Sequence, residues 1–123
     1  MEARILIVDD DAALLFAFNK IFRNAGYEVD SADTIDEAKK LIDMHPYQVI
    51  ITDLKFDANN QTGGYEIIKY VKHKAPETIT VLLTAFEAED LSPGAIKPDF
   101  YLKKPVKFET ISEIIHQIGI PRK

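Results

Sequence analysis

Acidic side chains follow two short apolar runs in this chain of 123 residues. The runs are 5–8 and 49–52, and the acids that follow them are Asp9, Asp10, Asp11 and Asp53. Such β-branched runs are typical of buried parallel strands, whose carboxyl ends border the crevice where open α/β sheets bind ligands. Asp53 taken alone is equally typical of a residue that begins a loop. Two strands that both end in acids favour a shared acidic site.

Crowded carboxylates need a cation or a proton, because charges about 5 Å apart repel by about 3 kcal/mol at an effective dielectric of roughly 20. Hard oxygen ligands suit Mg²⁺, which commonly bridges to a phosphoryl group. Thr84 and Lys104 follow two later strand-like runs, and a hydroxyl and an ammonium are suitable partners for phosphoryl oxygens. Beside a metal, Asp53 could attack phosphorus and become an acyl phosphate.

Helical stretches alternate with these strand-like runs. Asp11 can cap a first helix that Gly26 closes in a left-handed conformation. Thr34 and Glu37 form a capping box for a second helix, which Pro46 ends. Further helices are expected from Gly64 and around 108–118, and strands at 5–8, 27–29, 49–53, 79–83 and 100–102. This order predicts an α/β fold with a doubly wound, mostly parallel five-stranded sheet and right-handed crossovers.

Two connections depart from the short links expected of such a fold. The polar loop 54–63 is longer than most strand-to-helix connections, which is typical of a functional loop or of a tolerated insertion. The segment 87–97 contains Pro93 and Gly94 and is followed by Pro98, so we expect the helix there to be short or irregular.

Composition narrows the class of protein. The length predicts one domain, 1–123, and the absence of cysteine excludes disulfides and thiolate sites. A net charge of -5 disfavours direct nucleic acid binding. We find no signal region and no apolar run near the roughly 20 residues that span a bilayer, so we expect a soluble, cytoplasmic protein that does not bind membranes.

The acidic runs, with a third motif near Lys104, resemble the receiver domain of two-component response regulators. The stretch 5–11 is similar to that family's acidic-pair motif, 51–54 to its phosphoacceptor motif, and 101–105 to its lysine-proline motif. The motifs occur in the family's order and the resemblance covers nearly the whole chain. It implies a flavodoxin-like (βα)5 fold with strand order 2-1-3-4-5.

The resemblance also implies a role for each site residue. Asp53 would be phosphorylated, Asp10 would bind Mg²⁺ directly, and Asp9 would act largely through bound water. The metal would also bind Asp53 and the backbone carbonyl of Lys55. Lys104 would pair with the phosphoryl group and Thr84 would hydrogen-bond it, while Tyr101 would swing inward as Thr84 moves. The Lys104–Pro105 peptide would be cis, a form that only bonds preceding proline adopt cheaply.

By this resemblance the domain takes a phosphoryl group from a histidine kinase or a histidine phosphotransfer protein, changes conformation, and later hydrolyses the acyl phosphate. It would act as a switch with self-phosphorylation and self-dephosphorylation only, and would signal to a downstream protein or output domain that the sequence does not specify. Phe56-Asp57 replaces the family's usual Met-Pro, and about three extra residues precede Gly64, which affects the loop geometry and the phosphoryl lifetime.

Two other functions fit parts of this pattern. A metal-dependent phosphatase acting on external substrates would need an acid two places after Asp53, where Lys55 stands. A receiver-like interaction module with altered or lost phosphorylation would have no need for the crowded acids. The three histidines are scattered without metal-ligand spacing, and Gly63-Gly64 lacks the following Lys-Ser/Thr of a phosphate loop.

Overall fold

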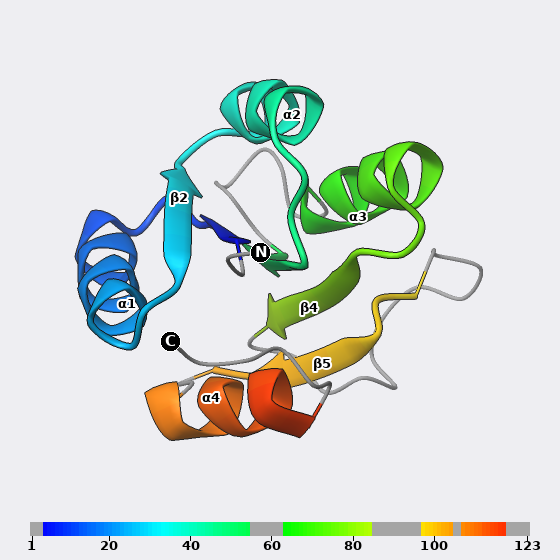
Figure 1. Ribbon diagram of the computed structural model, residues 1–123. Helices are drawn as coiled ribbons and strands as arrows, with labels where there is room; N and C mark the ends of the chain where they lie inside the picture. Colours follow the sequence, from blue (N-terminus) through cyan, green and yellow to red (C-terminus); the bar gives the residue numbers. More distant parts are fainter. Residues whose placement is uncertain (1–3, 55–62, 85–96, 105–106, 118–123) are drawn as a thin grey trace.

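The computed structural model describes residues 4–54, 63–84, 97–104 and 107–117, and it contains a five-stranded parallel sheet in the order β2-β1-β3-β4-β5 (Figure 1). The strands are β1 (Arg4–Val8), β2 (Glu28–Ala32), β3 (Val49–Asp53), β4 (Ile79–Thr84) and β5 (Phe100–Lys103). The described helices are α1 (Ala12–Asn24), α2 (Ile35–Met44), α3 (Gly63–Lys74) and α4 (Phe108–Gln117). The predicted fold class and strand order are confirmed.

Helices cover both faces of the sheet, so the central strands are apolar on both sides. α1 and α4 pack on one face, and α2 and α3 pack on the other (Figure 1). Successive residues of a strand point to opposite faces, which is why Ile5 and Ile7 join the first core and Leu6 and Val8 join the second. This double burial produces the continuous apolar runs that the sequence shows.

The helix starts follow their local sequence signals. The Asp11 side chain accepts hydrogen bonds from the amides of Ala13 (3.0 Å) and Leu14 (3.2 Å), as expected of a cap. Thr34 accepts from the Glu37 amide at 3.1 Å at the start of α2. Gly26, just beyond α1, has a φ of 96°, which lies in the left-handed region that favours glycine. The predicted cap at Asp11 and the predicted helix end at Gly26 are confirmed, as is the Thr34 cap that forms one half of the predicted capping box.

The second strand differs from its predicted range. The sequence predicted 27–29, whereas β2 runs from Glu28 to Ala32 and pairs along its full length with β1. Asp30 and Ser31 are polar and interrupt the apolar run, so the sequence does not indicate the second half of this strand. Pairing with β1 overrides that local signal, and Arg4 and Tyr47 satisfy the Asp30 carboxylate.

Several predictions concern residues outside the described part of the chain. These are the geometry of the loop after Leu54, the backbone carbonyl of Lys55, most of the irregular segment 87–97, and the peptide bond before Pro105. Within the described part, no helix is both long and apolar enough to cross a bilayer.

Candidate functional site

Three carboxylates meet at the carboxyl end of the central strands. β1 pairs with β3 in a register that places Val8 beside Thr52, so Asp9 and Asp53 leave adjacent strand ends. One carboxylate oxygen from each of Asp9, Asp10 and Asp53 lies within 4.8 Å of the others. Asp9 is fully buried and Asp53 is 7% exposed, whereas Asp10 faces solvent. The predicted convergence of these acids is confirmed.

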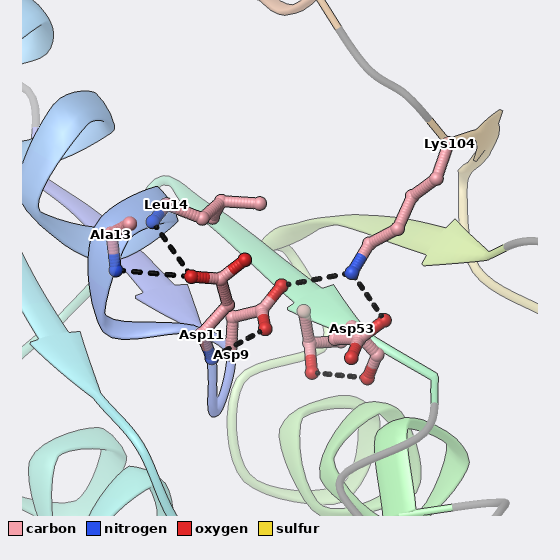
Figure 2. Close-up of polar contacts among 7 residues, drawn as sticks. Asp9, Asp11, Ala13, Leu14, Asp53 and Lys104 are labelled. Atoms are coloured by element: carbon pink, nitrogen blue, oxygen red, sulfur yellow. Dashed lines mark hydrogen bonds and ion pairs between the residues drawn. The ribbon is translucent and has the colours of Figure 1, made fainter.

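Lys104 joins two of these acids. Its Nζ lies 3.2 Å from Oδ2 of Asp9 and 3.1 Å from Oδ1 of Asp53, so one ammonium bridges the ends of β1 and β3 (Figure 2). The Lys104 amide donates to the Thr84 carbonyl at 2.7 Å, which fixes the lysine backbone just beyond β5. The sequence predicted Lys104 as a partner for a phosphoryl group, and the structure places its ammonium on the acids themselves.

Burial makes the buried acids hard to ionise. It is the main reason why the pKa of Asp53 is raised, and the nearby charge of Asp9 adds to the effect while Lys104 opposes it. Burial likewise raises the pKa of Asp9 against the hydrogen bond from Asp11 and the charge of Lys104. For Lys104, burial acts to lower the pKa, but its bond to Asp53 and the charge of Asp9 prevail and raise it. One ammonium therefore leaves the two acids only partly compensated.

The Asp11 backbone holds Asp9 in place. Its amide donates to Oδ1 of Asp9 at 2.9 Å, while its side chain caps α1 (Figure 2). Asp11 thus orients one acid of the site and anchors the helix that follows. The cap was predicted from the sequence and the bond to Asp9 was not, although an Asp that accepts from the amide two residues on is a common turn signal.

Gly64 brings α3 against the end of β3. A Cβ on Gly64 would lie 2.3 Å from the Asp53 carbonyl oxygen and 2.8 Å from Cα of Leu54. The Gly64 amide also donates to the Leu54 carbonyl at 2.9 Å. Only glycine permits this approach, so Gly64 positions the Asp53 backbone. The sequence predicted Gly64 at the start of a helix, and the Gly63-Gly64 pair was the one signal of a close approach.

Thr84 and Tyr101 lie on the β4–β5 side of the site. Thr84 is 2% exposed and ends β4, where it pairs with Lys103 of β5. Tyr101 pairs with Leu82 and is half-buried against the small cluster that contains Leu82. Thr84 therefore lies at the strand end that the sequence predicted, and Tyr101 lies inside β5, within the predicted strand 100–102.

The three carboxylates fit a divalent cation. They supply hard oxygen ligands, and two of them have a raised pKa because burial leaves their charge short of compensation. Mg²⁺ prefers such ligands and keeps several waters, for which the exposed Asp10 leaves room. Two buried acids and one exposed acid at the carboxyl ends of adjacent strands suit a site that binds a metal ion and a phosphoryl group.

Comparison with known sequences gives the same classification. The family model of the response regulator receiver domain matches residues 5–116. The alginate biosynthesis transcriptional regulatory protein AlgB of Pseudomonas putida is 30% identical over 106 residues, which are 85% of this chain and 23% of that protein. The photosynthetic apparatus regulatory protein RegA of Rhodobacter capsulatus is 26% identical over 113 residues, which are 90% of this chain and 60% of that protein.

Solved structures are similar over nearly the whole chain. The response regulator TrrA of Thermotoga maritima, in complex with Mg²⁺-BeF, has a TM-score of 0.78 at 28% identity and covers 94% of this chain and 98% of its own. A CheY-like receiver domain of Methanospirillum hungatei has a TM-score of 0.81 at 28% identity and covers 96% of this chain and 94% of its own.

The fold and the acidic site are consistent with a signalling domain of the receiver type, and the family match is specific. The chain belongs to the response regulator receiver domain family and is a receiver domain of two-component signal transduction. It spans less than two thirds of the length of AlgB or of RegA.

Proposed function

We propose that Asp53 accepts a phosphoryl group from a histidine kinase or a histidine phosphotransfer protein, in a reaction that needs Mg²⁺. The observation that carries the proposal is the Asp53 carboxylate itself, which is nearly buried, is bonded to Lys104 and has two further acids within reach of a shared cation. A structural aspartate does not need such crowding. The whole chain, 1–123, would form this single receiver domain.

The phosphoryl transfer is a substitution at phosphorus. An Asp53 carboxylate oxygen attacks the phosphorus of a phosphohistidine, the new P–O bond forms, and the old P–N bond breaks with its electron pair returning to the imidazole. The product is an aspartyl phosphate. Attack of water on the same phosphorus later releases inorganic phosphate and restores the carboxylate, which resets the switch.

Asp9, Asp10 and Asp53 would hold the metal. Asp10 would bind it directly, as its exposed position allows, and Asp9 would act largely through bound water. The backbone carbonyl of Lys55 would add a further ligand. When bound, Mg²⁺ supplies positive charge that offsets the crowded carboxylates and the phosphoryl oxygens.

Lys104, Thr84 and Tyr101 would convert phosphorylation into a change of shape. The Lys104 ammonium, now shared between Asp9 and Asp53, would pair with the phosphoryl group. The Thr84 hydroxyl would donate a hydrogen bond to it, and Tyr101 would move inward as Thr84 moves. The β4–β5 edge that carries these residues would then present a different surface to the downstream protein or output domain.

The domain would act on itself only, through self-phosphorylation by small phosphodonors and self-dephosphorylation. No direct binding of nucleic acid or membrane is part of this proposal, because the net charge is -5. The reaction would take place in the cytoplasm, as expected of this family.

Intact-mass measurement after incubation with Mg²⁺ and acetyl phosphate tests the assignment. The wild-type protein should gain the mass of one phosphoryl group, and Asp53→Asn should gain none. Asp11→Asn is the matched control, because Asn caps a helix as well as Asp does and the variant lies beside the same site. It should be phosphorylated like the wild type.

Two results would contradict the proposal. Uptake by Asp53→Asn would mean that another residue is the acceptor. A wild-type protein that gains no mass would instead favour a receiver-like interaction module that has lost phosphorylation.

A further inference from the structure

Tyr65, in the first turn of α3, carries a buried hydroxyl without a hydrogen bond. Among the side-chain atoms of the described residues it is the one buried polar atom without a hydrogen-bond partner. Buried polar groups are nearly always bonded, because an unmet bond costs the full desolvation of the group. The position of Tyr65 therefore needs an explanation beyond packing.

Tyr101 lies next to it. Both rings pack against the same small cluster of Leu54, Ile68 and Leu82, although Tyr65 comes from α3 and Tyr101 from the edge strand β5. Burial and then the Tyr101 hydroxyl raise the pKa of Tyr65 to about 12. The two hydroxyls are thus near each other without having the geometry of a hydrogen bond.

Tyr65 also adjoins the phosphoacceptor backbone. Gly64, its neighbour in the chain, packs so closely that an added Cβ would lie 2.3 Å from the Asp53 carbonyl oxygen, and its amide bonds Leu54. Leu54 in turn belongs to the cluster that supports both tyrosines. A continuous path of close contacts therefore runs from Asp53 through the start of α3 to Tyr101.

We propose that Tyr65 is a positioning residue for Tyr101, and that its hydroxyl completes a hydrogen bond with the Tyr101 hydroxyl only after Tyr101 has moved. The unmet bond penalises the present arrangement and the completed bond stabilises the moved one, so Tyr65 favours the switched position of β5. The inference rests on the proposed function, because it takes Tyr101 as the residue that responds to phosphorylation of Asp53.

Tyr65→Phe removes the hydroxyl and keeps the ring. At equal phosphorylated fraction, set by intact mass, the ratio of switched to unswitched Tyr101 read from its ring chemical shifts should fall about fivefold, as expected for one lost hydrogen bond. The unphosphorylated variant should be at least as stable as wild type, because a buried unbonded group is gone. Tyr70→Phe is the matched control: it removes a hydroxyl from the same helix, bonded to Asp43 at 2.7 Å, and should leave the ratio unchanged.

Tyr101→Phe and the double variant test the pair. If the two hydroxyls act on each other, Tyr65→Phe should add nothing in a Tyr101→Phe background when the response of the last helix, α4, is measured. Independent effects would overturn the inference, as would a Tyr65→Phe ratio equal to that of wild type or of Tyr70→Phe. A wild-type protein that takes no phosphoryl group would overturn both this inference and the proposed function, whereas normal uptake with no dependence on Tyr65 would overturn this inference alone.

Discussion

Aspartates at two places in this sheet have pKa values shifted in opposite directions. On the α2 face, Asp30 of β2 is bonded by Arg4 at 3.1 Å and by the Tyr47 hydroxyl at 2.6 Å. Burial disfavours its charge, but these two partners prevail and lower the pKa of Asp30. At the carboxyl end of the sheet, Asp9 and Asp53 share one ammonium and the pKa of each is raised.

The two places differ in how far nearby cations and hydrogen-bond donors offset the negative charge of the carboxylates. The Arg4–Asp30–Tyr47 cluster is complete: a single acid has its own cation and a hydroxyl donor, so ionisation stabilises the fold. The acidic site is incomplete because two nearly buried acids and an exposed third have one lysine between them. Binding of a metal ion should stabilise the incomplete site, whereas the complete cluster has no uncompensated charge for a metal ion to offset. We therefore expect substitutions in the two clusters to have different effects on stability, metal binding and phosphorylation.

The largest contrast is between Asp53→Asn and Asp30→Asn. The first should abolish phosphoryl uptake and leave the free energy of unfolding unchanged or higher, because it removes one crowded charge. The second should keep uptake and lower the free energy of unfolding by about 2 kcal/mol, since it removes a charged acceptor from two donors. Intact mass and urea unfolding without divalent cations measure the two effects. Equal destabilisation by both substitutions would end the comparison.

Removal of an exposed acid should affect Mg²⁺ binding at the acidic site only. Asp10→Ala should weaken Mg²⁺ binding at least tenfold, or about 1.4 kcal/mol, because it removes a direct ligand. Glu28→Ala, which removes an exposed acid at the start of β2, is the control and should leave the affinity unchanged. Titration calorimetry gives both values. An unaltered Mg²⁺ affinity in Asp10→Ala would show that the metal ligands are assigned wrongly.

Substitution of the basic residue in each cluster should lower stability, and added Mg²⁺ should restore stability in only one of the two variants. The Lys104 and Arg4 side chains are equally exposed, at 30%, and each is bonded to acids. Lys104→Met and Arg4→Met should each lower the free energy of unfolding by about 2 kcal/mol without divalent cations. Added Mg²⁺ should restore part of the loss in Lys104→Met and none in Arg4→Met, because only the first site accepts a second cation. Thermal unfolding with and without Mg²⁺ checks this, and rescue of Arg4→Met would contradict it.

The smallest expected effect is a pair of opposite pH slopes. The pKa of Asp30 is lowered in the fold, so its stabilisation is present above the unfolded value of about 3.9 and is lost as the pH falls through the folded pKa. The gap in unfolding free energy between wild type and Asp30→Asn should therefore shrink in acid.

The pKa of Asp53 is raised, so its ionisation costs stability as the pH rises through the unfolded value toward the folded one. Asp53→Asn should gain on wild type over that range when no metal is present. Parallel slopes for the two variants would show that the two acids are compensated alike.

Much of this protein was readable from local sequence. The continuous apolar runs predicted buried parallel strands, Asp11 and Thr34 predicted helix starts, and Gly26 predicted a helix end, all of which the structure confirms. These features depend on a few neighbouring residues and on burial of both faces of the sheet, so the pattern alone determines them. The acids at strand ends predicted a shared site because parallel strands end at one edge.

Other features arose only from contacts between distant segments. The full length of β2 depended on pairing with β1 and on the partners of Asp30, which lie 26 and 17 residues away. The same was true of the Lys104 bridge, which joins positions 95 residues apart, and of the close approach of Gly64 to Asp53. The sequence by itself determined which residues form the acidic site. The tertiary structure decided how far each negative charge is compensated. Burial and the distance to a partner, rather than residue type, determine whether an ionised aspartate stabilises the fold or keeps an uncompensated charge that a metal ion could offset.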